Sequence, residues 1–341
     1  MPNTPFAQNI IALIWDFDKT LIPGNMQAPL FQKFGVEESV FWREVRQLEA
    51  YYRKQGIRVN KETVYLNHVL TYVREGIFKG LNNRMLEELG KELTFYPGLP
   101  EFFPKIKSII EEDDRYKTFD IKLEHYIVST GFAAMIRGSA IAQYVDGIWG
   151  CEFIEEPAKP GFASVRGGIG EAARGDAARS SEAEVAAVVV DEAGGAEITQ
   201  IGYAIDNTSK TRALFEINKG ANKYADIDVN SKMDEAARRV PFEHMIYIAD
   251  GPSDVPAFSI LNKSGGRTYA VYPKGHMEAF RQADMLRRDE RIQMFGEADY
   301  QEGSQTYMWL VLQAKQIADS IVRKKEQAIQ ASVSQPPTHL I

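Results

Sequence analysis

The chain has 341 residues, a formal net charge of −7, and 44% hydrophobic and 26% charged positions, a balance typical of a soluble globular protein with a sizeable core. The acidic net charge and the lack of a long basic stripe argue against a nucleic-acid partner, because phosphate backbones are bound by clustered lysine and arginine. A single cysteine, Cys151, excludes an internal disulfide and favours a reducing compartment, so we expect a cytoplasmic protein. No segment resembles a signal peptide or a membrane span, and we expect no membrane partner.

The first predicted strand runs from Ile10 to Trp15 and leads directly into Asp16-Phe17-Asp18-Lys19-Thr20. Alternate side chains of an extended segment point the same way, so we expect Asp16 and Asp18 to share a face. Adjacent carboxylates repel unless a cation or a shared proton relieves them, and Mg²⁺ takes carboxylates together with waters and phosphate oxygens. The junction favours a magnesium and phosphate site, although a bare pair of aspartates is more often a solvated loop.

The next segment, from about residue 26 to residue 93, shows helical periodicity only. The pattern predicts amphipathic helices over 41–52, 64–73 and 84–89. Elsewhere strand-like runs alternate with helical patterns, which predicts an α/β fold with a Rossmann-like parallel sheet flanked by helices. We therefore expect residues 1–24 and 94–330 to form this core and residues 25–93 to form a separate helical domain.

Further strands are predicted over 125–128, 147–153, 201–205, 245–249 and 268–272, and a core helix over 307–325. The strands 147–153 and 201–205 are expected to form a hairpin. Between them, residues 157–200 are rich in Ala, Gly and Glu and cannot bury enough apolar surface to offset the entropy of ordering. We predict a mobile insertion there, more plausibly a tolerated surface loop than a lid, and a frayed tail over 331–341.

Three more polar groups stand at element boundaries. Ser129-Thr130-Gly131 follows the second strand, where hydroxyls and free amides can hold an anion. Lys210 stands in the first turn of a predicted helix with Asn207 or Thr208 as its N-cap, and a lysine there is unfavourable for the helix dipole unless an anion lies nearby. The strand 245–249 runs into Asp250-Gly251-Pro252-Ser253-Asp254, a second pair of carboxylates at a strand end.

Together and in this order, these four motifs resemble those of the haloacid dehalogenase (HAD) superfamily of hydrolases. That family shows D-x-D-x-T, a strand-terminal Ser or Thr, a Lys, and an acidic G-D-x-x-x-D type loop, and here only Ala249 departs, where the loop usually has glycine. The resemblance covers residues 10–272 and makes the helical segment similar to a C1-type cap. An acid two residues after the first aspartate implies hydrolysis of phosphate esters and neither dehalogenation nor ion transport.

The resemblance implies a role for each motif residue. Asp16 is then the nucleophile that forms an aspartyl-phosphate, and Asp18 the general acid and later the base for water. Ser129, with Thr130 and Gly131, is implied to bind phosphate oxygens, and Lys210 to balance their charge. Magnesium is implied to be held by Asp16, the backbone carbonyl of Asp18 and Asp250, with Asp254 either a further ligand or a residue that orients the ligands.

The substrate is expected to be a small phosphorylated molecule. The sequence 128–132, V-S-T-G-F, resembles the phosphoserine phosphatase branch, but Asn25 stands where those enzymes place the glutamate that holds the substrate amine. Asn25 is therefore a candidate substrate-binding residue of different chemistry. Trp42 is equally compatible with stacking on a base and with core packing.

Two alternatives stay open beside the hydrolase. A phosphotransferase would pass the aspartyl-phosphate to an alcohol other than water. A non-catalytic phospho-ligand binding protein would keep the fold, but it would have no need of both the nucleophile and the acid.

Overall fold

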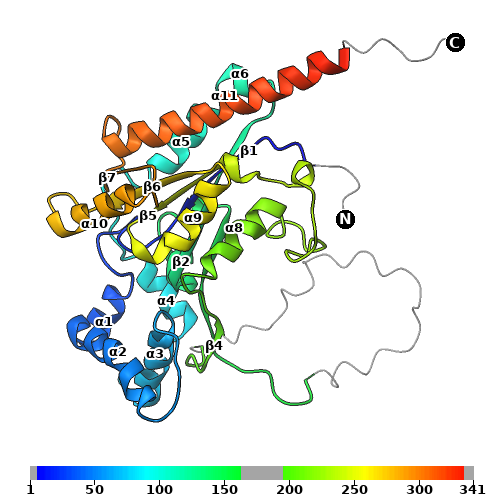
Figure 1. The fold of residues 1–341 in the computed structure, drawn as a ribbon. Coiled ribbons are helices and arrows are strands. Elements are labelled where there is room, and N and C mark those ends of the chain that lie inside the picture. The colour runs from blue at the N-terminus through cyan, green and yellow to red at the C-terminus, as the bar shows by residue number, and fades with distance from the viewer. Residues whose placement is uncertain (1–5, 163–194, 334–341) are drawn as a thin grey trace, which may run out of the picture.

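The computed structural model describes residues 6–162 and 195–333, which contain one seven-stranded sheet in the order β4-β3-β2-β1-β5-β6-β7 (Figure 1). Every neighbouring pair of strands is parallel except β3 with β4. The strands are β1 (Ile10–Trp15), β2 (Lys122–Phe132), β3 (Gly147–Ile154), β4 (Gln200–Tyr203), β5 (Met245–Ala249), β6 (Arg267–Tyr272) and β7 (Met294–Glu297). The predicted α/β fold is confirmed, as is the predicted hairpin of β3 and β4.

Helices lie on both faces of the sheet and in a separate group of α1, α2 and α3 at the lower left of Figure 1. The α-helices of the described residues are α1 (Ala28–Phe34), α2 (Glu38–Arg53), α3 (Val64–Arg74), α4 (Asn83–Gly90), α5 (Phe102–Glu111), α6 (Asp114–Lys117), α7 (Ala133–Gly138), α8 (Lys210–Lys219), α9 (Val255–Lys263), α10 (Met277–Arg288) and α11 (Gln305–Val333). Short 3₁₀ helices are η1 (Ala142–Tyr144), η4 (Glu235–Ala237), η5 (Phe242–His244) and η6 (Pro252–Asp254).

The central strand β1 is buried on both faces, which explains its continuous apolar sequence. Leu13 and Trp15 point into a hydrophobic cluster shared with α5 and α11, whereas Ala12 and Ile14 point into a second cluster shared with α8, α9 and α10. Successive side chains of a strand alternate between its faces, so one run of residues anchors both helical layers. The carboxyl end of β1 therefore lies between those of β2 and β5 in the middle of the sheet.

The helical segment after β1 contains α1 to α4. The helix α1 was not anticipated, because its seven residues show too little of a helical period. The helix α4 packs directly on α7 of the core, where a Cβ atom added to Gly138 would lie 1.8 Å from the carbonyl oxygen of Glu87. The division of the chain into a core and a cap over residues 25–93 stays a prediction.

Three other features differ from the sequence expectation or fall outside the described residues. The short strand β7 and the helix α10 were not predicted. The helix α11 continues to Val333 and overlaps the first three residues of the segment predicted as a tail. Most of the predicted insertion, residues 163–194, and the rest of that tail, residues 334–341, lie outside the described residues.

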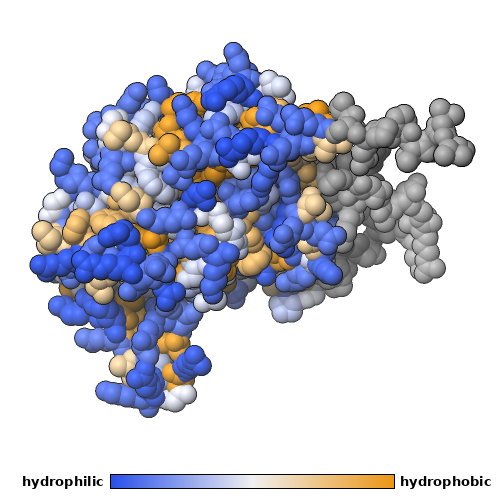
Figure 2. Space-filling view, turned by 45° about the horizontal axis from the view of Figure 1, so that its top comes forward, coloured by the Kyte–Doolittle hydropathy of each residue, from blue (hydrophilic) through white to orange (hydrophobic). Residues whose placement is uncertain are grey.

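The face of the molecule in Figure 2 is largely hydrophilic, with apolar residues dispersed among the polar ones. Within residues 6–162 and 195–333, no helix combines the length and the apolar character that crossing a membrane requires.

The buried His125 on β2 is held as a neutral imidazole. The indole Nε1 of Trp15 donates to His125 Nδ1 at 3.2 Å, and His125 Nε2 lies 3.2 Å from the carbonyl oxygen of Phe103. Since Nδ1 accepts, the ring proton sits on Nε2 and donates to that carbonyl. Burial lowers the pKa of His125 to about 3.

We expect His125 to weaken the fold as the pH falls. The pKa of His125 is about 3 in the folded state, against an ordinary value of 6.5. Between pH 6.5 and pH 3 the imidazole is therefore protonated only in the unfolded chain, which lowers the free energy of unfolding as the pH falls. Replacing His125 with Asn lowers the free energy of unfolding at pH 7.5, but this deficit should shrink by about 2 kcal/mol between pH 7.5 and pH 5. Urea denaturation of both proteins at several pH values measures the difference. His276→Asn, at an exposed histidine, is the control, and a deficit for His125→Asn that is independent of pH would contradict the interpretation.

Candidate active site

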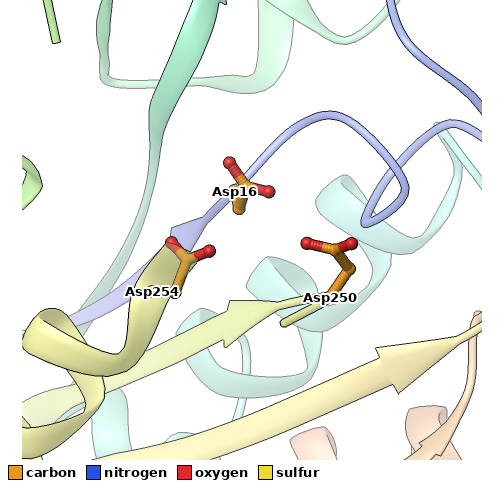
Figure 3. A group of neighbouring side chains, drawn as sticks. All are labelled: Asp16, Asp250 and Asp254. Atoms are coloured by element: carbon orange, nitrogen blue, oxygen red, sulfur yellow. The ribbon is translucent and has the colours of Figure 1, made fainter. Parts of the chain in front are cut away.

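The carboxylates of the first and fourth motifs meet at the carboxyl ends of β1 and β5. Asp16 directly follows β1, and its backbone N–H donates to the carbonyl oxygen of Ile248 on β5 at 2.9 Å. Asp250 directly follows β5, and Asp254 lies at the end of η6 and the start of α9. Figure 3 shows the three carboxyl groups grouped around one space. Neighbouring parallel strands end at the same edge of the sheet, which is where open α/β sheets bind ligands.

Lys210 joins the first motif to the fourth. Its Nζ donates to Asp16 Oδ1 at 2.8 Å and to Asp254 Oδ1 at 2.7 Å, and the three residues are 1%, 4% and 0% exposed. Burial alone lowers the pKa of Lys210, but the charges of Asp16 and Asp254 outweigh it, so the net shift is upward. The lysine is therefore a fixed positive charge beside Asp16.

The helix that carries Lys210 begins differently from the sequence expectation. Neither Asn207 nor Thr208 supplies the cap. Instead the Oδ1 of Asp206 accepts hydrogen bonds from the backbone N–H groups of Thr208 at 3.0 Å and Ser209 at 2.7 Å. An aspartate readily binds the amides two and three residues ahead of it, so it satisfies the free amides before the helix begins.

Asp16, Asp250 and Asp254 each offer a carboxylate oxygen, and these atoms all lie within 4.8 Å of one another. Burial, with the charge of neighbouring carboxylates, raises the pKa of Asp16 to about 6 and that of Asp250 to about 7. The side chain of Asp254 is already engaged. Besides Lys210, it accepts from Tyr247 Oη at 2.6 Å and from Ser253 Oγ at 2.7 Å.

Asp18 lies partly exposed on the loop after β1, and its Oδ1 accepts the backbone N–H of Met26 at 2.9 Å. Burial, followed by the charge of Asp16, raises the pKa of Asp18 to about 8. At neutral pH this carboxyl group therefore holds a proton that it can give to a ligand.

Thr20, which the sequence reasoning gave no role, donates from Oγ1 to Asp16 Oδ2 at 3.3 Å.

The residues of the second motif lie at the end of β2. Ser129 is 1% exposed, and its Oγ accepts the backbone N–H of Gly131 at 3.0 Å. The Oη of Tyr65, on α3, donates to the carbonyl oxygen of Thr130 at 2.5 Å. The thiol of Cys151 donates to the same oxygen at 3.2 Å, so this turn is held from both the helical segment and the sheet.

A cavity of about 230 Å³ opens over these groups. Asp16, Asp18, Asn25, Thr130, Gly131, Lys210 and Asp250 line it, whereas Ser129 and Asp254 do not. Its other walls come mainly from the helical segment: Gln27, Trp42, Val45, Lys61, Glu62 and Tyr65. Of these six residues, only Trp42 was named from the sequence as a possible ligand contact. The local sequence around the other five does not show that this helical segment covers the ends of the strands.

Asn25 is tied to the first helices of this segment. Its Nδ2 donates to Glu38 Oε1 at 3.0 Å, and the indole Nε1 of Trp42 donates to the same oxygen at 3.0 Å. The carboxylate of Glu38 therefore holds both side chains at the rim of the cavity. Trp42 thus lies at the site and also packs edge-on against Phe31 and Phe41, so both of the sequence interpretations describe part of its environment.

Comparison with known proteins gives one extensive relative in sequence. The chain is 39% identical over 308 residues to a protein of Borreliella burgdorferi that is described only as uncharacterized, and the match covers 89% of this chain and 96% of the relative. No protein-family model matches the chain.

Solved structures similar to this chain are more distant. A HAD family hydrolase from Salmonella enterica serovar Typhi is 14% identical with a TM-score of 0.46, over 86% of this chain and 68% of that one. A phosphoserine phosphatase in its apo form is 15% identical with a TM-score of 0.44, over 86% and 96% of the two chains. A probable phosphoserine phosphatase from Vibrio cholerae is 13% identical with a TM-score of 0.44, over 94% and 69%. Similarity at this level carries no functional argument.

Replacing Lys210 with Met should destabilise the fold strongly. The change leaves Asp16 and Asp254 buried without their cation, and breaking a buried pair in this way costs about 3–5 kcal/mol. The matched control is Lys91→Met, which breaks the pair of Lys91 with Glu88, where the two side chains are 61% and 60% exposed. That change should cost less than about 1 kcal/mol. Denaturant unfolding of both variants provides the measurement, and equal small losses would show that Lys210 is not a buried charge.

Proposed function

This chain belongs to the same family as the uncharacterized protein of Borreliella burgdorferi, and we propose that it is a HAD-type, magnesium-dependent phosphomonoester hydrolase that acts through an aspartyl-phosphate. The observation that carries the proposal is the hydrogen bond from Lys210 to Asp16, two residues that are 194 positions apart in the chain. Both residues line the same cavity, together with Asp250. A nucleophilic carboxylate needs a neighbouring positive charge to approach an anionic phosphoryl group.

The donor set fits a magnesium ion. Asp16, Asp250 and Asp254 bring carboxylate oxygens within 4.8 Å of one another, and hard oxygen ligands are those that Mg²⁺ prefers. The raised pKa values of Asp16 and Asp250 reflect burial and crowded negative charge, which a divalent cation would relieve. Asp16 and Asp250 would be direct ligands together with the backbone carbonyl of Asp18. Asp254, whose oxygens are already engaged by Lys210, Tyr247 and Ser253, would chiefly orient the lysine. When bound, magnesium would neutralise charge on the phosphoryl oxygens.

In the first step a carboxylate oxygen of Asp16 forms a bond to phosphorus while the bond from phosphorus to the ester oxygen breaks. Asp18 gives its proton to that departing oxygen, so the alcohol leaves neutral. The pKa of about 8 for Asp18 keeps it protonated for this task near neutral pH. Lys210 stays protonated and offsets the negative charge that gathers on Asp16 and the phosphoryl group.

In the second step Asp18, now ionised, takes a proton from a water molecule. The water oxygen bonds to phosphorus, the bond between Asp16 and phosphorus breaks, and inorganic phosphate leaves. Thr130 lines the same cavity and its hydroxyl is suited to bind a phosphoryl oxygen, whereas the N–H of Gly131 already donates to Ser129 Oγ and shapes this turn. An alcohol entering in place of water would make the enzyme a phosphotransferase.

The substrate is proposed to be a small phosphorylated molecule. The cavity of about 230 Å³ is smaller than the sites of about 300–1,000 Å³ that hold drug-sized ligands. Lys19, Lys61 and Glu62 place charges of both signs at its walls, which suits a polar alcohol component better than an apolar one. Asn25, bonded to Glu38, would contribute to this end of the site.

The proposal predicts phosphate release that requires both magnesium and Asp16. Phosphate released from a panel of small phosphomonoesters should fall by about 10³-fold or more in Asp16→Asn, because an amide cannot form the phosphorylated intermediate. Removing magnesium with a chelator should abolish release from the native protein.

The matched control is Asp120→Asn, which makes the same chemical change at an exposed residue before β2, and it should leave the rate unchanged. Acid-quenched enzyme should carry label from a ³²P-phosphoester on the native chain but not on Asp16→Asn. Labelling with transfer only to added alcohols would favour the phosphotransferase, and neither labelling nor release across the panel would favour a binding protein.

A further inference from the structure

We propose that Gln27 determines substrate specificity by hydrogen bonding a hydroxyl or amino group on the alcohol part of the phosphomonoester, beyond its ester oxygen. The inference rests on the proposed function, because it concerns the substrate of the same site. It assigns that substrate to a chemical class: small phosphomonoesters of polyols, sugars or amino alcohols.

The side chain of Gln27 is buried at the cavity without a full set of partners. It is 2% exposed and lines the same cavity as Asp16 and Asp18. In the described part of the chain, its Oε1 is buried and has no hydrogen-bond partner. Of the residues there that carry such an atom, Gln27 alone lines this cavity. A buried amide oxygen without a donor costs folding free energy, so a ligand that supplies the donor would bind with that cost removed.

A structural role as a helix cap does not explain this side chain. Gln27 stands at the N-cap position of α1, where a side-chain oxygen commonly accepts a backbone N–H of the first turn. Here no such bond forms, although the backbone carbonyl of Gln27 accepts the N–H of Phe31 at 3.1 Å. The backbone of Gln27 thus serves the helix while its Oε1 has no donor.

The neighbouring Met26 holds Gln27 in a defined place relative to the acid. Its backbone N–H donates to Asp18 Oδ1 at 2.9 Å, and its Sδ accepts the N–H of Phe132 at 3.0 Å. Met26 also packs tightly on Gly131, since a Cβ atom added there would lie 2.2 Å from Met26 Cε. Met26 therefore links Asp18, the end of β2 and the start of α1, and Gln27 is the next residue.

This placement puts Gln27 on the leaving-group side of the site. Asp18 is proposed to protonate the ester oxygen, so the atoms attached to that oxygen extend from the neighbourhood of Asp18. A hydroxyl or amino group on the carbon atoms that follow would be close to Gln27. An amide can accept from either group through Oε1, and it can also donate to a hydroxyl oxygen through its NH₂.

The test uses Gln27→Met, which keeps the length of the side chain and removes its hydrogen bonding. Glycerol 3-phosphate is compared with propyl phosphate, and phosphoethanolamine with ethyl phosphate, by the kcat/KM of native and variant enzyme. The native enzyme should prefer the polar member of at least one pair. The variant should lose about tenfold or more on that member and less than about threefold on its apolar analogue, as expected for one lost hydrogen bond.

The second measurement is the Tm of the proteins without substrate. Gln27→Met should raise Tm by about 1–3 °C, because it removes a buried acceptor that has no donor. Gln32→Met, at an exposed position of the same helix, is the control and should change neither Tm nor the ratio of kcat/KM within a pair.

The outcomes separate this inference from the proposed function. Suppose that the native enzyme releases phosphate and that this release requires magnesium and Asp16. If Gln27→Met then loses kcat/KM equally on both members of each pair, or has a lower Tm than the native protein, only the role of Gln27 is overturned. Phosphate release from the wider panel of phosphomonoesters, but from none of these four, overturns the substrate class alone, whereas no release from any phosphomonoester overturns both proposals. A selective loss together with a raised Tm supports both.

Discussion

The buried ion pairs of Lys210 with Asp16 and Asp254 are the interaction on which the site depends. They form only if the start of α8 lies against the carboxyl ends of β1 and β5. Burial of all three residues removes solvent screening, so the attraction is strong and the loss of a partner is costly. The central position of β1, whose two faces anchor separate hydrophobic clusters, brings the strand ends and the helix start together.

This arrangement concentrates negative charge where one lysine cannot fully balance it. Asp16, Asp18 and Asp250 all have raised pKa values, because burial disfavours their ionised forms and each charge opposes its neighbours. Such groups lower the stability of the ligand-free protein at neutral pH, where a solvated carboxylate would ionise freely. Sites that carry out chemistry often contain residues shifted in this way. The raised pKa of Asp18 and the fixed charge of Lys210 suit the separate acid and electrostatic roles that we propose for these two residues of one cavity.

The helical segment completes the site as well as covering it. Tyr65 donates to the Thr130 carbonyl and the Met26 N–H donates to the Asp18 carboxyl group, so this segment contacts both the end of β2 and the loop after β1. The loop before α3 also reaches the start of α8, where Asn60 Nδ2 donates to Asp206 Oδ2 at 3.0 Å. Changes in this segment would therefore alter both access to the cavity and the placement of the proposed reacting groups.

Local sequence patterns were enough to identify the strands that end in polar residues and the chemical type of those residues. The runs before Asp16 and Asp250 are short, apolar and followed at once by turn residues, and such patterns are local, so they can be read without the fold. The alternation of strand-like and helical runs then predicted a parallel sheet flanked by helices. The helix α1 escaped this reasoning because seven residues show too little of a helical period to be distinguished from a loop.

Which distant side chains meet depends on how the whole chain folds. The bonds of Tyr247 and Lys210 to Asp254, and the placement of Tyr65 and Gln27 at the cavity, depend on segments far apart in the chain. Tyr247 sits inside an apolar strand and Gln27 before a short helix, so their local patterns do not distinguish them from packing and capping residues. Their roles follow from long-range contacts, which a local sequence pattern does not contain.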